Sequence, residues 1–320
     1  MSDQEAQLSD NPSVSRESQR ETDTNLDSLT PLARELAAEN LRRQKLKGKR
    51  LPKPDATRIF TISNQKGGVG KTTTTVNLSA AMARAGMHVL VVDIDPQGNA
   101  STALNIPHGS DDNSIYDVLL DDLEIQDVVQ NCPDVDGLQV APATIELAGA
   151  EIELVSLVAR EQRLSRALAA YFKYREEQGL PRLDYIFIDC PPSLGLLTVN
   201  AFVAATEVLI PIQTEYYALE GLSQLVKNIN MIQKHLNADL KVSTILLTMY
   251  DGRTRLATQV ADEVREYFPT EVLSTLIPRN VRISEAPSFQ QSVLTYDPQS
   301  SGALSYREAA AEIAERGAPA

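Results

Sequence analysis

Glycine, lysine and threonine gather in residues 64–73, which read NQKGGVGKTT. Glycines let backbone N–H groups approach phosphate oxygens closely, and the first turn of a following helix adds partial positive charge at the same place. Lys71 is spaced to reach β- and γ-phosphates, and the Thr72 hydroxyl is spaced to ligate Mg²⁺. The segment therefore predicts a nucleotide site; the alternative is a glycine-rich turn without a ligand. The expected binding residues are Gly67, Gly68, Val69, Gly70, Lys71, Thr72 and Thr73.

Two carboxylates follow the apolar run at residues 88–92. Asp93 and Asp95 stand two positions apart, so both lie on one face of an extended chain. The carboxyl ends of parallel strands are where open α/β folds bind ligands. One acid can support a metal ion and the other can position a water molecule. The alternative is that both only cap or close a turn.

A third acid, Asp189, ends the apolar run YIFID at residues 185–189. In a phosphate-binding fold such an acid contacts Mg²⁺, usually through a water molecule. Thr72 and Asp189 are therefore the expected metal-contacting residues. These motifs do not separate adenine from guanine, but the Asn-Lys-x-Asp motif of GTPases is absent. We expect ATP and Mg²⁺ as cofactors, and hydrolysis of the γ-phosphate with slow intrinsic turnover.

Strands alternate with helices from residue 58 onward. Near-continuous Val, Ile and Leu runs, typical of strands buried on both faces, lie at residues 58–62, 88–93, 185–189, 207–211 and 242–247. Helical patterns lie at residues 71–85, 144–177 with a break near Ala159, 217–236 and 255–267. This order predicts an α/β fold, a mostly parallel twisted sheet flanked by helices.

Composition limits the class of protein. The chain has 320 residues, 42% of them hydrophobic, and a net charge of −13. This argues against a wholesale polyanion binder but leaves room for a local basic patch. Cys132 and Cys190 are the only cysteines, which excludes a disulfide scaffold and an iron–sulfur site held by one chain. The polar start and the lack of a long apolar run predict a cytoplasmic protein.

The first 57 residues differ from the rest. They are polar and predicted to be a mostly disordered extension, with one helix starting after Thr30. A basic run at residues 42–53 carries seven Lys or Arg and no acid. It is interpreted as a solvated linker, or as a contact for DNA, an anionic membrane or a protein such as a polar scaffold. The ATPase domain is predicted at residues 58–320.

The spacing of Lys66 and Lys71, with Gln65 where a general P-loop has glycine, resembles the deviant Walker A motif of the ParA/MinD ATPases. Further blocks at residues 93–99, 189–195, 213–221 and 278–288 resemble the ParA (Soj) partitioning proteins. The resemblance implies a P-loop ATPase that forms a sandwich dimer. It further implies that Lys66 crosses to the nucleotide of the partner subunit, while Lys71 contacts the nucleotide of its own subunit. Asp95 would orient the attacking water and Asp93 would support the site. Pro278 and Asn280 would lie against the base.

The same resemblance implies a DNA-segregation function. An ATP-bound homodimer would bind double-stranded DNA without sequence preference, and a ParB-type centromere-binding partner would stimulate hydrolysis and release it, moving the origin region. The protein would then be cytoplasmic and nucleoid-associated. Arg253 and Arg282 match positions that contact DNA in ParA proteins. The alternative is that they are solvated or pair with Asp251 and Glu285.

Three rival functions share the phosphate loop. A MinD-like membrane-cycling ATPase needs a basic, amphipathic C-terminal helix, whereas residues 306–320 are alanine-rich and acidic, so no membrane insertion is expected. A reductase like the nitrogenase iron protein needs cluster-bridging cysteines, and the cysteines here do not fit that pattern. A scaffold that binds ATP and barely hydrolyses it stays open.

Overall fold

The computed structural model describes residues 30–318, which divide into two units between Lys49 and Arg50. In the first unit, α2 (Pro31–Leu46) starts where the Thr30 side chain accepts a hydrogen bond from the Ala33 N–H. Glu39 and Arg43 pair one turn apart at 2.8 Å. The predicted helix is confirmed and covers part of the basic run, which is helical through Leu46 instead of disordered. The prediction for residues 1–29 lies outside the described residues.

The second unit starts earlier than the predicted boundary at residue 58. Lys53 forms an ion pair with the buried Asp184 at 2.9 Å, and the Arg182 guanidinium donates to the carbonyl of Pro54, itself a buried residue. Residues 50–57 are therefore part of the folded unit rather than of a disordered extension. The sequence of residues 50–57 could not show that they are folded, because they contact residues more than a hundred positions away.

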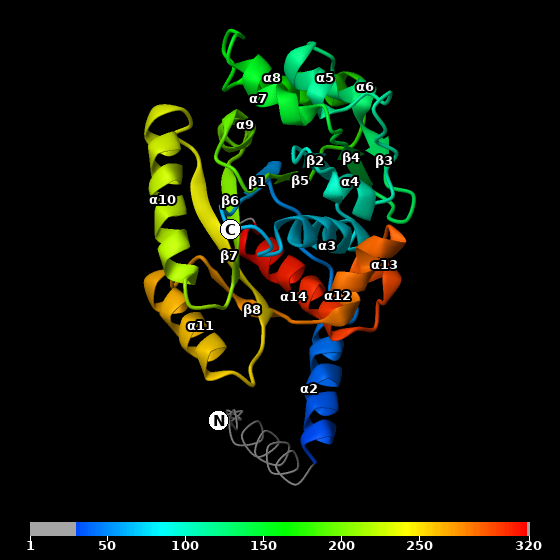
Figure 1. Cartoon of the computed structure of the whole chain (residues 1–320). Helices are drawn as coiled ribbons and strands as arrows, with labels where there is room; N and C mark the ends of the chain where they lie inside the picture. Colours follow the sequence, from blue (N-terminus) through cyan, green and yellow to red (C-terminus); the bar gives the residue numbers. More distant parts are fainter. Residues whose placement is uncertain (1–29, 319–320) are drawn as a thin grey trace, which may run out of the picture. The chain divides into compact units, whose positions relative to one another are not determined.

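An eight-stranded sheet forms the middle of the second unit (Figure 1). The strand order is β3-β4-β2-β5-β1-β6-β7-β8, and in the described chain every neighbouring pair is parallel except β3 with β4. The strands are β1 (Arg58–Ile62), β2 (Val89–Asp93), β3 (Gln130–Asn131), β4 (Leu138–Ala141), β5 (Tyr185–Asp189), β6 (Glu207–Gln213), β7 (Lys241–Tyr250) and β8 (Val272–Pro278). The predicted mostly parallel sheet is confirmed.

Helices cover both faces of this sheet. One face carries α3 (Lys71–Arg84), α4 (Asn99–Ala103), α12 (Val281–Glu285), η1 (Ala286–Phe289), α13 (Val293–Tyr296) and α14 (Ser301–Arg316). The other carries α5 (Ile115–Leu120), α6 (Ile125–Val128), α7 (Leu147–Leu154), α8 (Arg163–Glu177), α9 (Leu196–Ala204), α10 (Ala218–His235) and α11 (Arg255–Tyr267). The predicted break near Ala159 is confirmed: it separates α7 from α8 and has φ +53°.

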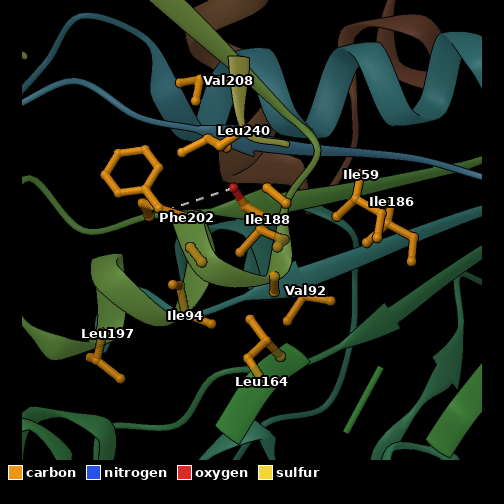
Figure 2. Close-up of a cluster of buried hydrophobic side chains, with 14 of the residues drawn as sticks. Ile59, Val92, Ile94, Leu164, Ile186, Ile188, Leu197, Phe202, Val208 and Leu240 are labelled. Atoms are coloured by element: carbon orange, nitrogen blue, oxygen red, sulfur yellow. Dashed lines mark hydrogen bonds between the residues drawn. The ribbon is translucent and has the colours of Figure 1, made fainter. Parts of the chain in front are cut away.

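Side chains of the central strands point alternately to the two faces of the sheet, and each face has its own hydrophobic core. Ile186 and Ile188 of β5 face the core that also holds Phe202 of α9, as Figure 2 shows. Phe187 faces the other core, where its ring lies 5.6 Å from that of Phe60. Because both faces are buried, each strand reads as a continuous apolar run, which is the pattern that predicted it.

The C-terminal helix α14 lies within the predicted ATPase domain, but no helix was predicted at these residues. It lies against α3 and β8, and it buries Leu304, Tyr306 and Ile313 together with its alanines. The apolar side chains that a membrane-binding tail would use are thus inside the protein. None of the helices within residues 30–318 combines the length and the apolar character needed to cross a bilayer.

A buried ion pair joins the start of β1 to β6. The Arg58 guanidinium donates from Nε and one Nη to both carboxylate oxygens of Glu207, each at 2.7 Å, and its other Nη donates to the Ile313 carbonyl of α14. Burial would raise the pKa of Glu207, but the hydrogen bonds and charge of Arg58 outweigh it and leave the pKa below its usual value. The pair therefore stabilises the fold while Glu207 is ionised.

We predict that Glu207→Gln lowers the free energy of unfolding by about 2 kcal/mol at neutral pH, because it removes a charge-assisted pair. The folded-state pKa of Glu207 lies below the unfolded value of about 4.3. The contribution is therefore complete above that pH and is lost as the pH falls through the folded-state pKa. Urea unfolding at several pH values tests this, with the exposed Glu263→Gln as control. A stability gap that stays constant down to about pH 3 contradicts it.

Candidate nucleotide site

The parallel register brings three strand ends to one edge of the sheet. Asp189 of β5 lies opposite Ile62 of β1 on one side and opposite Asp93 of β2 on the other. The predicted phosphate loop follows Ile62 directly. Acids that are nearly a hundred residues apart in sequence are thus next to each other and beside the loop.

The loop at residues 63–70 curves into the start of α3. Gly68 and Gly70 have φ values of +75° and +91°, a backbone conformation that favours glycine. Asn64 holds the loop: its side-chain oxygen accepts from the Lys66 N–H at 3.0 Å, and its amide donates to the Pro211 carbonyl at 2.9 Å. No side chain caps α3, so its first N–H groups are available to an anion.

Lys71 lies inside the curve of the loop and is buried. Its Nζ donates to the Lys66 carbonyl at 3.2 Å. Burial lowers the pKa of Lys71, while the nearby carboxylates of Asp189 and Asp95 act in the opposite direction. The ammonium of Lys71 is thus enclosed by loop backbone, a position that suits the predicted contact with a phosphate group.

The Asp189 carboxylate is completely buried and held by two hydroxyls of α3. Thr72 donates to one oxygen and Thr75 to the other, both at 2.8 Å. Burial raises the pKa of Asp189 and the neighbouring Asp93 carboxylate raises it further, while the hydrogen bonds from Thr72 and Thr75 act in the opposite direction. Hydroxyl and carboxylate oxygens are ligands that Mg²⁺ prefers, so Thr72 and Asp189 fit that ion. Thr75 was missed, because its role depends on α3 facing β5.

Protein side chains alone do not complete a metal centre here. Across residues 30–318 there is no group of three or more His, Cys, Asp or Glu side chains placed to hold a metal. Mg²⁺ in nucleotide sites commonly takes only one or two protein ligands and completes its shell with phosphates and water. The small donor set therefore suits an ion that arrives with a nucleotide.

Asp93 and Asp95 have different surroundings. Asp93 is fully buried and accepts from the Ser101 N–H at 2.9 Å and the Ser101 hydroxyl at 2.8 Å. Burial raises its pKa despite these bonds. The Asp95 carboxylate accepts from the Gln97 N–H at 3.1 Å, at the start of a turn that the Gly98 N–H closes on the Asp95 carbonyl. Asp93 thus braces the segment that carries Asp95.

A pocket of about 530 Å³ lies beside the loop, within the size range of small-ligand sites. Gly70 and Thr73 line one side, and Pro278 and Asn280 line another, at the end of β8. The Asn280 side chain also accepts from the Arg282 N–H at 2.8 Å, which fixes the start of α12. The remaining lining residues are Thr248, Met249, Ile277, Arg279, Val281, Ile283, Ser284, Pro287 and Tyr306.

Lys66 differs from Lys71 in its exposure. Its side chain is 49% exposed and forms an ion pair with Glu215, which precedes α10. The ammonium therefore lies at the surface of the phosphate loop rather than within it. Directly after Glu215, the rings of Tyr216 and Tyr217 are both exposed.

The two arginines expected to contact DNA are both paired with acids. Arg253 donates from Nε and Nη to the two oxygens of Asp251, each at 2.8 Å, and lowers the Asp251 pKa to about 2. Arg282 lies 2.9 Å from Glu285 and 3.4 Å from Asp297. The pairing alternative is therefore observed. Both side chains are nevertheless accessible to solvent, 89% and 53% exposed.

We predict that Thr248→Val weakens nucleotide binding about fivefold, because the Thr248 hydroxyl donates to the Val69 carbonyl of the loop at 2.8 Å. Both residues are buried, so the carbonyl would lose its partner. Titration with a fluorescent ATP analogue measures the effect. The control is Thr244→Val, which changes a buried threonine nearer the start of β7. Equal affinities for the Thr248→Val protein and the unaltered protein would contradict this role.

Comparison with known proteins agrees with this geometry. A family model described as an AAA domain matches residues 57–242. The sporulation initiation inhibitor protein Soj of Bacillus subtilis (strain 168) is 54% identical over 260 residues, 81% of this chain and 99% of that protein. The chromosome partitioning protein ParA of Myxococcus xanthus (strain DK1622) is 51% identical over 265 residues, 82% and 89% of the two chains.

A solved structure has a similar fold. A crystal structure titled cobyrinic acid a,c-diamide synthase from Mycobacterium smegmatis, with bound ATP analog and magnesium, has a TM-score of 0.67 and 37% identity, covering 80% of this chain and 93% of that one. The phosphate loop, the strand-end acids and similarity over four fifths of the sequence show that the chain belongs to the ParA/Soj family of partitioning ATPases.

Proposed function

We propose that this chain is a Mg²⁺-dependent ATPase whose ATP-bound dimer binds DNA and is released when a ParB-type partner stimulates hydrolysis. The observation that carries the proposal is the division of the two loop lysines, with Lys71 enclosed and Lys66 exposed. One subunit would then bind the phosphates with its own loop and Lys71, while the Lys66 ammonium faces solvent. Repeated binding and release would move the origin region over the nucleoid.

Within one subunit, the loop N–H groups and Lys71 would bind the β- and γ-phosphates. Thr72 and Asp189 would hold Mg²⁺, which neutralises charge on the phosphate oxygens when bound. Asp95 would orient the attacking water, while the buried Asp93 keeps its segment in place. Pro278 and Asn280 would lie against the adenine in the adjoining pocket. Catalysis by this set is positioning and electrostatics, which fits slow unstimulated turnover.

Lys66 would act on the partner's nucleotide. To do so it leaves Glu215 and enters the opposite site, which requires two subunits facing each other across their phosphate loops. Leu194, which follows the end of β5 by five residues, exposes an apolar side chain that a protein–protein contact at this edge would cover. The relatives' names, partitioning proteins, agree with a cycle of this kind.

Substitutions of the two loop lysines test ATP binding and dimer formation separately. We predict that Lys71→Ala weakens ATP binding about tenfold or more, because it removes a charge-assisted phosphate contact. Lys66→Ala is expected to keep ATP affinity within about twofold but to abolish ATP-dependent dimer formation and hydrolysis. Calorimetry and sedimentation measure the two properties. ATP-dependent dimers of the Lys66→Ala protein would contradict the crossing role.

DNA binding rests on local positive charge in a chain of net charge −13. Arg253 precedes α11 and Arg282 lies on α12, and both are exposed. A dimer doubles such contacts, so binding would depend on ATP and fall steeply with salt. The MinD-like alternative is less well supported, because the apolar face of α14 is buried.

We predict that the ATP-bound protein binds a non-specific duplex and that Arg282→Glu abolishes this binding at moderate salt. The milder Arg282→Ala should reduce the salt slope by about two, one phosphate contact for each subunit. Fluorescence anisotropy with ATP, ADP or no nucleotide measures it, with the exposed Lys234→Glu as a charge-matched control. Binding by Arg282→Glu equal to that of the control would contradict the proposed surface.

The basic run at residues 42–53 is a separate candidate contact, for DNA or for a protein such as a polar scaffold. A variant lacking residues 1–49 tests it, because this removes five of the seven basic residues of the run and keeps the folded unit that begins at Arg50. If DNA binding does not depend on nucleotide and is lost in this variant, the DNA contact lies in the N-terminal extension. A nucleotide response that is unchanged in this variant would leave the DNA surface on the ATPase domain.

A further inference from the structure

His108 lies between α4 and α5, outside the predicted site, and its ring is fixed from two sides. Nδ1 is 2.7 Å from the Ile106 carbonyl, and Nε2 is 3.2 Å from the Thr102 hydroxyl of α4. A carbonyl oxygen can only accept, so Nδ1 carries the hydrogen. In the neutral ring Nε2 then accepts from Thr102. The imidazole thus links the loop after α4 to α4 itself.

The same ring packs closely against Gly98. A Cβ built on Gly98 would lie 2.9 Å from His108 Cδ2 and 3.1 Å from Nε2, closer than ordinary packing allows. Gly98 also has φ +58°, so glycine is required there for two reasons. Gly98 ends the turn that begins at Asp95, because its N–H donates to the Asp95 carbonyl at 2.9 Å. His108 therefore covers the far end of the turn that carries Asp95.

The near end of this turn is held independently. Asp93 accepts two hydrogen bonds from Ser101, and the Ser101 hydroxyl in turn accepts from the Ala143 N–H at 3.2 Å. The segment from Asp93 to Ser101 is thus tied down at the strand end and at α4. Between them, the Asp95 N–H donates to Asp93 Oδ1 at 3.2 Å, and Gly98 faces both the His108 ring and the Ala143 carbonyl.

We propose that His108 is a positioning residue that fixes the Asp95 turn for hydrolysis, acting through Gly98 and Thr102. The inference rests on the proposed role of Asp95. Neither hydrogen bond of His108 goes to the phosphate loop, so its loss should leave nucleotide affinity intact. Turnover depends on where the Asp95 carboxylate lies, and a small displacement of a positioning group costs a large factor in rate.

Three variants test this inference. His108→Asn can keep a donor toward the Ile106 carbonyl, but its shorter side chain leaves Gly98 uncovered. His108→Gln places an amide nearer the position of Nε2 and should restore part of the function. His235→Asn, on the exposed end of α10, is the matched control.

The expected result for His108→Asn is a single-turnover rate about tenfold lower, with ATP affinity within about twofold and an unchanged melting temperature. Amides of residues 95–102 should exchange hydrogen faster even without nucleotide. His108→Gln should lie between His108→Asn and the unaltered protein in both rate and exchange. The exchange measurement makes the test independent of activity.

Two results would overturn the inference: an unchanged rate and exchange in His108→Asn, or losses of affinity, rate and melting temperature together, which indicate a general folding role. Asp95→Asn separates the inference from the proposed function. If Asp95→Asn hydrolyses ATP normally, the role of Asp95 fails and the inference with it. If Asp95→Asn is slow while His108→Asn is not, only the inference fails.

Discussion

The buried carboxylate of Asp189 is the group on which the site depends. A buried charge is costly unless it is hydrogen-bonded and neutralised. Thr72 and Thr75 provide the hydrogen bonds, and burial together with the nearby Asp93 carboxylate raises the pKa of Asp189. The parallel register fixes this arrangement, because it places Asp93 and the end of β1 on the two sides of Asp189. The phosphate loop can then meet the acids only at this edge.

The enclosed groups and the exposed groups have separate tasks. Lys71 and Asp189 are buried, which suits the proposed contact with a single bound nucleotide. Lys66, Arg253 and Arg282 are exposed and held by nearby acids, so each can exchange its intramolecular partner for another molecule. This division suits a protein whose nucleotide state controls association. Exposed ion pairs contribute little to stability, so exchanging them costs little.

Much of this could be predicted from local sequence, and the rest depends on tertiary contacts. The phosphate loop and strand-end acids were predictable because each is a short motif on an element whose continuous apolar run reflects burial on both faces. β8 and α14 were missed, since alanines and alternating polar residues give a weak pattern. The roles of Thr75 and His108 depend on which strand or turn lies opposite, and no spacing encodes that.

The most direct test of the central claim is calorimetric titration of ATP with Mg²⁺ and with EDTA, for the unaltered protein and Asp189→Asn. The structure predicts that Mg²⁺ tightens binding to the unaltered protein about tenfold or more and that Asp189→Asn removes this gain. Asp184→Asn, a buried acid just before the other end of β5, should retain it. An equal Mg²⁺ effect in the unaltered protein and Asp189→Asn would contradict the assignment of Asp189 as the metal-holding acid.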